Sequence, residues 1–344
     1  MLIKKFPEDF IVEEVSDIEL KKSGSFAVYK LEKKQLNTEQ AVGYISKKCN
    51  IERKDIKYAG SKDRNAITRQ YITIFRNNGK LEFKTDNLKL KFLGFIEEPL
   101  SLGRLKGNDF QIIIRELSDA QIKNFEEKIL SEQMIPNYFD DQRFSEYNLD
   151  IGSAILRKDF KSATELLLLS SGTNEQEVKA HLQRFPNDHI GAIKKIPSKI
   201  LLFYLHAVQS FIFNQVLSDI LKERAEKNVQ DKSITYDTAK YRNGEFIFYK
   251  DSNYSGIDIK ELPLIGFDTK STICDTELKK IGISQKDFIT RSIPEMSLEG
   301  STRECFVVPE IHSYDIDPED KIIKINFFLT KGAYATVFIK SLFS

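Results

Sequence analysis

The sequence predicts an α+β protein in which a largely helical segment is inserted into a mixed-sheet domain. Three observations carry this prediction. The first 138 residues mix strand-like and helix-like stretches, residues 153–224 change to a helical period, and the chain from residue 306 onward is again rich in strands. A length of 344 residues is enough for two domains. We expect the boundaries 1–138, 139–305 and 306–344, with the first and last parts forming one domain.

The N-terminal part reads as strands separated by capped helices. Apolar and alternating runs predict strands at residues 10–15, 25–31, 71–75, 88–95 and 110–115. Asn37 followed by Gln40, and Ser118 followed by Gln121, are capping-box pairs that predict the start of a helix. Residues 104–108 read as a loop.

The middle and the end of the chain differ in hydrophobic period. Apolar side chains recur at helical spacing in the middle, at Ala163, Leu166, Leu167, Leu202, Leu205, Ile212, Val216 and Ile220. Strand-like patches return near residues 236–249, and residues 321–329 form a clear strand run. A helical block between two strand-rich segments is the pattern of an inserted domain.

Composition favours a protein that folds without disulfides or a metal. The chain is 41% hydrophobic, and no uninterrupted run approaches the roughly 18 apolar residues of a membrane span. Its three cysteines are odd in number and lack metal-like spacing, and its four histidines form no close pair. We expect free thiols, no metal site, no Ser-His-Asp hydrolase chemistry and a cytoplasmic location.

Charge argues against a uniformly basic RNA-coating protein. The 52 basic and 51 acidic residues leave a net charge of +1. Any binding of nucleic acid must therefore depend on local basic patches, which occur at residues 4–5, 53–69, 104–106 and 157–158. The alternative is that these runs are solvated surface.

The most informative stretch is residues 58–74, YAGSKDRNAITRQYITI, in which Asp63 stands between Lys62 and Arg64. Cations on both sides favour an ionised carboxylate. The small residues before it, among them Gly60, let the backbone bend and let a ligand approach. This pattern predicts an anionic catalyst inside an anion-binding wall, although a surface salt-bridge cluster on a hairpin would have the same composition.

This stretch resembles the G-x-K-D-x-x-A-x-T-x-Q signature of the tRNA pseudouridine synthase D (TruD) family. The matching residues are Gly60, Lys62, Asp63, Ala66, Thr68 and Gln70. Five more segments are similar to the same family in the same order: FPEDFIVEE at 6–14, LGRLKGNDF at 102–110, IPNYFDDQRF at 135–144, QSFIFN at 209–214 and GAYAT at 332–336. Residues 225–290 match only loosely. The resemblance implies a pseudouridine-synthase mixed-sheet catalytic domain interrupted by an inserted, largely helical α/β TRUD domain.

The resemblance also implies the activity. A family member is an isomerase that converts uridine to pseudouridine in tRNA, with the uridine at nucleotide position 13 of the D arm as the family-typical target. The reaction breaks the N1–C1′ bond, turns the base and forms a C5–C1′ bond without redox change. The chain has neither a G-x-x-x-x-G-K-[ST] loop nor a G-x-G-x-x-G fingerprint. We expect tRNA as the partner, and no membrane, metal or nucleotide cofactor.

The resemblance places the catalytic role on Asp63, which acts either as the nucleophile on C1′ or as the base that removes the C2′ proton. It implies that Lys4, Phe10, Asn108 and Phe110 line the substrate site. An amide can hydrogen-bond the uracil edge, and a phenyl ring can stack on a base that has left its helix. A turn asparagine, core aromatics and a one-residue exchange of Lys4 with its neighbour Lys5 are the alternatives.

Three more cations belong to the expected substrate-binding set. Lys62 and Arg64 flank Asp63, and a cation such as Arg64 would orient the carboxylate, but the sequence does not decide which residue does so. Arg143 either holds a phosphate or braces the domain junction.

Two other functions remain open at this point. An RNA-binding protein or RNA chaperone with the same fold but without catalysis would keep the basic patches, and the intact Asp63, Lys62, Asn108 and Phe110 argue against it. A metal-dependent RNA hydrolase would need clustered carboxylates or histidines, which these motifs lack.

Overall fold

The structure is a computed structural model that describes residues 1–130, 134–170, 175–227, 234–251, 254 and 256–344. Contacts between residues divide the chain into two compact units. Unit 1 comprises Met1–Leu130, Val308–Ala335 and Phe343, and unit 2 comprises Ser131–Val307, Thr336–Leu342 and Ser344. The chain therefore leaves the first unit and returns to it.

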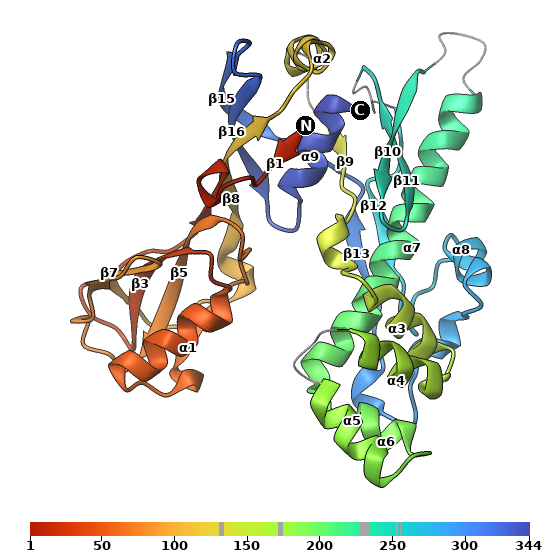
Figure 1. The fold of residues 1–344 in the computed structure, drawn as a ribbon, viewed down its shortest axis with the longest axis horizontal. Helices are drawn as coiled ribbons and strands as arrows, with labels where there is room; N and C mark the ends of the chain where they lie inside the picture. The colour runs from red at the N-terminus through yellow and green to blue at the C-terminus, as the bar shows by residue number, and fades with distance from the viewer. Residues whose placement is uncertain (131–133, 171–174, 228–233, 252–253, 255) are drawn as a thin grey trace. The chain divides into compact units, whose positions relative to one another are not determined.

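Unit 1 is built on one mixed sheet, drawn in Figure 1, to which ten strands contribute among the described residues. Their order is β15-β16-β8-β2-β5-β3-β7-β6, with β1 beside β8 and β4 beside β5. The bounds are β1 Leu2–Ile3, β2 Phe10–Ser16, β3 Phe26–Lys34, β4 Ile56–Tyr58, β5 Ile67–Phe75, β6 Phe83–Lys84, β7 Leu88–Ile96, β8 Leu105–Arg115, β15 Glu310–Asp317 and β16 Ile322–Thr330. Strands β2 and β5 run parallel, and the other pairs are antiparallel. The predicted α+β class with a mixed sheet is confirmed.

Helix α1 (Thr38–Cys49) covers one face of this sheet. Its buried residues Ala41, Val42 and Ile45 pack with side chains of β3, β5 and β7 in one core cluster. The predicted capping box is present, because Asn37 Oδ1 accepts a hydrogen bond from the Gln40 N–H at 2.7 Å. Ser118 caps α2 (Asp119–Ile129) in the same way.

One local expectation is wrong. Residues 105–108, which read as part of a loop, belong to β8, because β8 pairs with β2 from Leu105 onward and with β16 from Gly107 onward. Gly107 allows β8 and β16 to approach closely, because a Cβ at this position would lie 2.1 Å from the carbonyl oxygen of Leu329. Pairing with strands distant in sequence thus overrides the loop composition.

Unit 2 is mainly helical. Its helices are α3 Asn148–Leu156, α4 Phe160–Leu169, α5 Glu175–Arg184, α6 His189–Ile193, α7 Ser198–Lys227, α8 Asp275–Lys280 and most of α9 Ala335–Phe343. Three small antiparallel sheets accompany them: β10 Tyr236–Tyr241 with β11 Gly244–Tyr249, β12 Glu261–Leu264 with β13 Ser301–Glu304, and β9 Ile135–Pro136 with β14 Phe306–Val307. Helix α3 packs against α7 and α4, and helices α4, α5 and α6 pack with one another (Figure 1).

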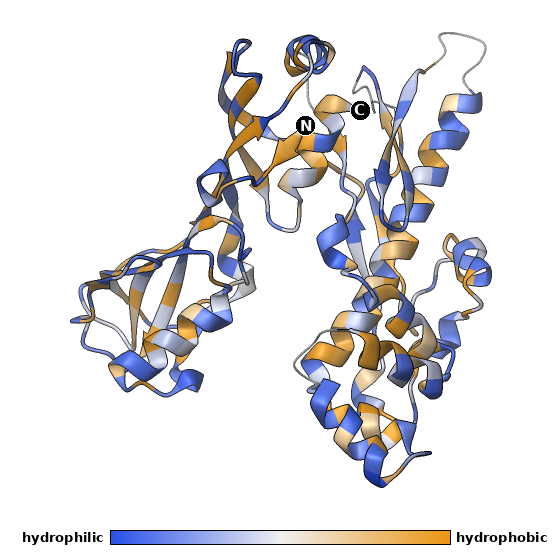
Figure 2. Ribbon diagram, in the orientation of Figure 1, coloured by the Kyte–Doolittle hydropathy of each residue, from blue (hydrophilic) through white to orange (hydrophobic). Residues whose placement is uncertain are grey.

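Helix α7 is long and apolar enough to cross a membrane by length and composition alone, and Figure 2 shows its many hydrophobic residues. Buried residues make up 61% of its most apolar window. Within this helix, Gln209 donates to the Ile265 carbonyl and Asn214 bonds both backbone groups of Phe139, each at 2.8 Å. These are the contacts of a core helix, in which Gln209 and Asn214 serve as polar packing inside unit 2.

The compact units divide the chain at slightly different points from the expected boundaries. Residues 134–138 go with unit 2, where β9 pairs with β14. Residues 336–342 of the expected C-terminal part also go with unit 2. In that unit Lys340 lies 3.0 Å from Asp140 and 3.2 Å from Asp141, with its ammonium over the Tyr241 ring. Neither the β9–β14 pairing nor these contacts of Lys340 can be read from a local sequence pattern.

Candidate active site

Asp63 lies in the loop between β4 and β5, and its partner is Lys4. The Lys4 Nζ is 2.7 Å from the Asp63 Oδ2, and the two side chains are 16% and 35% exposed. Arg64, offered by the sequence as an orienting cation, is exposed and makes no ion pair among the described residues. Chain topology brings Lys4 across 59 positions to the carboxylate, so the cation beside Asp63 comes from the N-terminus.

Lys4 is held in an unusual backbone conformation. It follows directly after β1 and has φ of +63°, in the left-handed region. Such a conformation costs a residue with a Cβ about 1–2 kcal/mol, and it tends to be kept where function needs it. Its ammonium also lies 4.0 Å from the centroid of the Phe10 ring. Lys5 instead pairs with Glu116 at 2.9 Å, which resolves the one-residue ambiguity between these lysines.

Asp9 anchors the turn between Lys4 and Phe10. Its carboxylate is 1% exposed, accepts from the Phe6 N–H at 3.0 Å, and accepts from Arg115 at 2.8 and 3.1 Å. A buried carboxylate with a bidentate arginine fixes geometry well. Sequence reasoning missed Asp9, although it stands in the P-E-D-F element that supplied Phe10.

Three phenylalanines form an aromatic wall on the same sheet: Phe10 on β2, Phe110 on β8 and Phe327 on β16. The Phe10 and Phe110 rings meet edge to face at 6.0 Å, and Phe110 stacks on Phe327 at 5.3 Å. All three are buried. Phe327 was not singled out from the sequence, where its only signal is its place in the strand run 321–329.

Asn108 shares the Phe110 face of β8, because alternate residues of a strand point the same way. Its Oδ1 atom is buried, and within the part of the chain that the structure describes it has no hydrogen-bond donor. An unsatisfied buried acceptor costs about 1–3 kcal/mol. The amide is thus an acceptor that a bound ligand could satisfy.

Lys62 is engaged within the fold. Its ammonium lies 3.0 Å from the Glu14 Oε2, with side-chain exposures of 8% and 0%, although the alignment is poor for a hydrogen bond. A substrate phosphate would have to displace Glu14 to reach it, and breaking a buried pair is costly. The structure therefore favours a role for Lys62 in holding the loop. The substrate contact expected from the sequence is less favoured.

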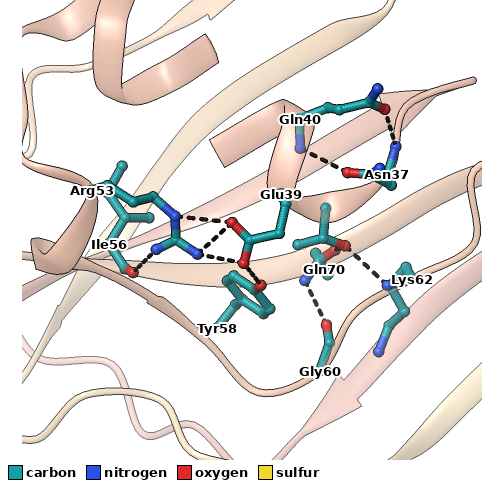
Figure 3. A network of polar contacts seen from close by, with 10 residues as sticks. Asn37, Glu39, Gln40, Arg53, Ile56, Tyr58, Gly60, Lys62 and Gln70 are labelled. Atoms are coloured by element: carbon teal, nitrogen blue, oxygen red, sulfur yellow. Dashed lines mark hydrogen bonds and ion pairs between the residues drawn. The ribbon is translucent and has the colours of Figure 1, made fainter. Parts of the chain in front are cut away.

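Two neighbouring side chains hold the backbone of the Asp63 loop, as Figure 3 shows. Thr38, the first residue of α1, accepts from the Lys62 N–H at 2.9 Å and donates to Gln70 at 2.9 Å. Gln70 in turn donates to the Gly60 carbonyl at 3.1 Å. Thr38 at the start of α1 and Gln70 of the signature thus hold the Asp63 loop, one at the Lys62 N–H and the other at the Gly60 carbonyl.

Arg143 belongs to unit 2. It donates from Nε to the Ser210 hydroxyl at 3.1 Å, and its guanidinium lies 5.0 Å from the Phe203 ring centroid and 5.6 Å from that of Phe139. These contacts hold Arg143 within unit 2, and both roles named for it, a phosphate contact or a brace at the domain junction, stay predictions.

The described residues contain no group of three His, Cys, Asp or Glu side chains close enough together to hold a metal ion. The three cysteines are free thiols, as expected.

Comparison with known proteins agrees with this fold. The family model described as tRNA pseudouridine synthase D (TruD) matches residues 1–185 and 170–342. A probable tRNA pseudouridine synthase D 1 of Methanococcus maripaludis is 31% identical over the full length of both chains. The tRNA pseudouridine synthase D of Aquifex aeolicus is 28% identical over 99% of this chain and 97% of the relative.

A solved structure shares the fold. The crystal structure of the putative tRNA pseudouridine synthase D of Methanosarcina mazei superposes with a TM-score of 0.67 at 22% identity, covering 99% of this chain and 93% of that one. The mixed sheet and the matching family model define an isomerase that makes pseudouridine. The chain belongs to the tRNA pseudouridine synthase D (TruD) family.

Proposed function

We propose that this protein converts uridine to pseudouridine in tRNA, at nucleotide position 13 of the D arm, with Asp63 as the catalytic carboxylate. The observation that carries the proposal is the pairing of a partly exposed Asp63 with Lys4 beside the aromatic wall. The names of the relatives support the reaction and the substrate class, and the D-arm position is the family-typical one.

The Lys4 ammonium holds the Asp63 carboxylate in place. It fixes the Oδ2 atom at 2.7 Å and leaves the Asp63 side chain 35% exposed. An ionised carboxylate at the ribose can attack C1′ or take the C2′ proton, and either step releases the uracil for reattachment through C5. Neither route requires a metal or a redox cofactor.

In this proposal the extruded base docks against the aromatic wall. Taking a base out of its stack costs a few kcal/mol, which stacking and hydrogen bonds in the pocket offset. Phe110 can stack, and the unsatisfied Asn108 Oδ1 can accept the uracil N3–H. The uracil N3–H would therefore supply the hydrogen-bond donor that the Asn108 Oδ1 atom lacks in the free protein.

An assay on unmodified tRNA tests the function. The protein is incubated with a tRNA transcript in EDTA, and pseudouridine is read as carbodiimide-dependent reverse-transcription stops. We expect a stop at position 13 that disappears when that uridine is replaced by cytidine. Binding without any stop would instead indicate the RNA-binding or chaperone function, and activity lost only in EDTA would indicate a metal requirement.

The pocket residues should act after binding. We expect Phe110→Leu and Asn108→Ala each to lower the single-turnover rate by about 10-fold to 100-fold with little change in tRNA Kd, because a stacked base is worth roughly 1–3 kcal/mol. Phe125→Leu, which changes a buried ring on α2, is the control for lost packing. Folded pocket variants that work at the full rate would show these residues to be core.

Binding should be strongly salt-dependent. Each phosphate contact lowers log K by about 0.9 or less per decade of salt. We expect Arg64→Ala and Arg104→Ala to flatten that slope, since Arg64 is exposed and the 3.4 Å pair of Arg104 with Glu98 is a weak surface pair. Lys123→Ala, on α2 of the same unit, is the control. An unchanged slope in both arginine variants would assign these arginines to contacts within the protein.

A further inference from the structure

Lys33 on β3 is a fully buried cation. Its exposed fraction is 0%, and its ammonium donates to three backbone carbonyls: Leu36 at 2.7 Å, Asp63 at 2.7 Å and Lys62 at 3.3 Å. An ammonium carries three N–H donors, so these contacts use all of them. Two of the three acceptors belong to the Asp63 loop.

Burying this charge is unfavourable for folding. Desolvation lowers the pKa of Lys33 to about 8, and the negative charge of Asp63 opposes part of that shift. A buried charge with well-made partners is often no more stabilising than an apolar side chain of similar volume. A gain in stability therefore does not explain why a lysine is buried at this position. Its hydrogen bonds to the Asp63 loop do explain it.

The three carbonyls also point their negative ends at one place. Without a cation they would repel one another, and the Asp63 carboxylate next to them would feel the same field. The Lys33 ammonium neutralises this cluster while turning the Asp63 carbonyl inward. Lys33 thus holds the backbone of Asp63, while Lys4 pairs with its side chain.

We propose that Lys33 is a positioning residue for Asp63, which fixes the loop backbone so that the carboxylate reaches the ribose in a productive geometry. The inference rests on the proposed function. It assigns to Lys33 no contact with the substrate, so a change there should affect turnover and leave tRNA binding intact.

The test compares Lys33→Met with Leu31→Ala, a buried change two positions earlier on the same strand and in the same core. Each variant is assayed below its melting temperature for single-turnover pseudouridine formation and for tRNA Kd. We expect Lys33→Met to be about 10-fold to 100-fold slower with Kd within about twofold, as small misplacements of catalytic groups are costly. Leu31→Ala should melt at least as early yet keep nearly the wild-type rate.

Lys33→Gln, which keeps two donors without the charge, decides the matter if Lys33→Met does not fold, and we expect it to be slowed with unchanged Kd. Wild-type rate in either folded lysine variant, an equal rate loss in Leu31→Ala, or failure of both lysine variants to fold would overturn the inference. Absence of pseudouridine with the wild-type protein would instead reject the proposed function, so the two failures are distinct.

Discussion

We expect Asp63→Asn to abolish pseudouridine formation while the protein still binds tRNA. Asparagine keeps the shape of the side chain but can neither attack C1′ nor accept the C2′ proton. The rate should therefore fall by more than about 10³-fold, since acid–base groups alone contribute up to about 10⁴-fold. Loss of the ion pair with Lys4 should matter little for folding, because Asp63 is 35% exposed. Carbodiimide-dependent stops and a tRNA Kd within a few-fold of wild type are the measurements.

Asp55→Asn is the matched control for this change. Asp55 is the other acid between residues 53 and 69. It precedes the signature and has no part in the proposed site. It should keep the wild-type rate. Measurable turnover by rigorously pure Asp63→Asn protein, or an equal loss in Asp55→Asn, would show that the reaction does not depend on the Asp63 carboxylate.

A chain shortened to residues 1–305 should fail to fold cooperatively, although it keeps Asp63 and Phe110. Strand β16 lies between β15 and β8 and pairs with β8 from Ile323 to Thr330. Its four inward side chains, Ile323, Ile325, Phe327 and Leu329, are fully buried. At roughly 1.5–3 kcal/mol each, their loss removes about 6–12 kcal/mol. That amount is comparable to the entire stability of a domain, about 5–15 kcal/mol.

The complementary chain restores the sheet. With the boundaries expected from the sequence, a join of residues 1–138 to 306–344 through a flexible linker should give a folded but poorly active protein. The structure amends the ends to 1–130 and 308–335, because residues 134–138 and 336–342 pack with unit 2. Thermal melts followed by circular dichroism compare the two shortened chains. A cooperative melt for 1–305, with none for the joined chain, would contradict the assignment of β15 and β16 to unit 1.

The sequence determined those features that depend on neighbours along the chain. The capping boxes at Asn37 and Ser118 form as predicted, since their partners stand three residues away. Strand alternation gave β2, β3 and β7 to within a few residues, and the change of period located the inserted unit. The ordered motifs identified the family, as the comparisons confirm.

Only the tertiary structure decided which side chains meet. Lys4 and not Arg64 pairs with Asp63, Phe327 joins the aromatic wall, and Lys33 reaches the Asp63 carbonyl. Each of these contacts spans 30 or more positions and depends on strand order and register, such as β16 beside β8 and β3 beside β5. Local patterns carry no information on register between distant strands. A basic or aromatic residue in the sequence therefore indicates the chemistry available, and the fold selects the partner.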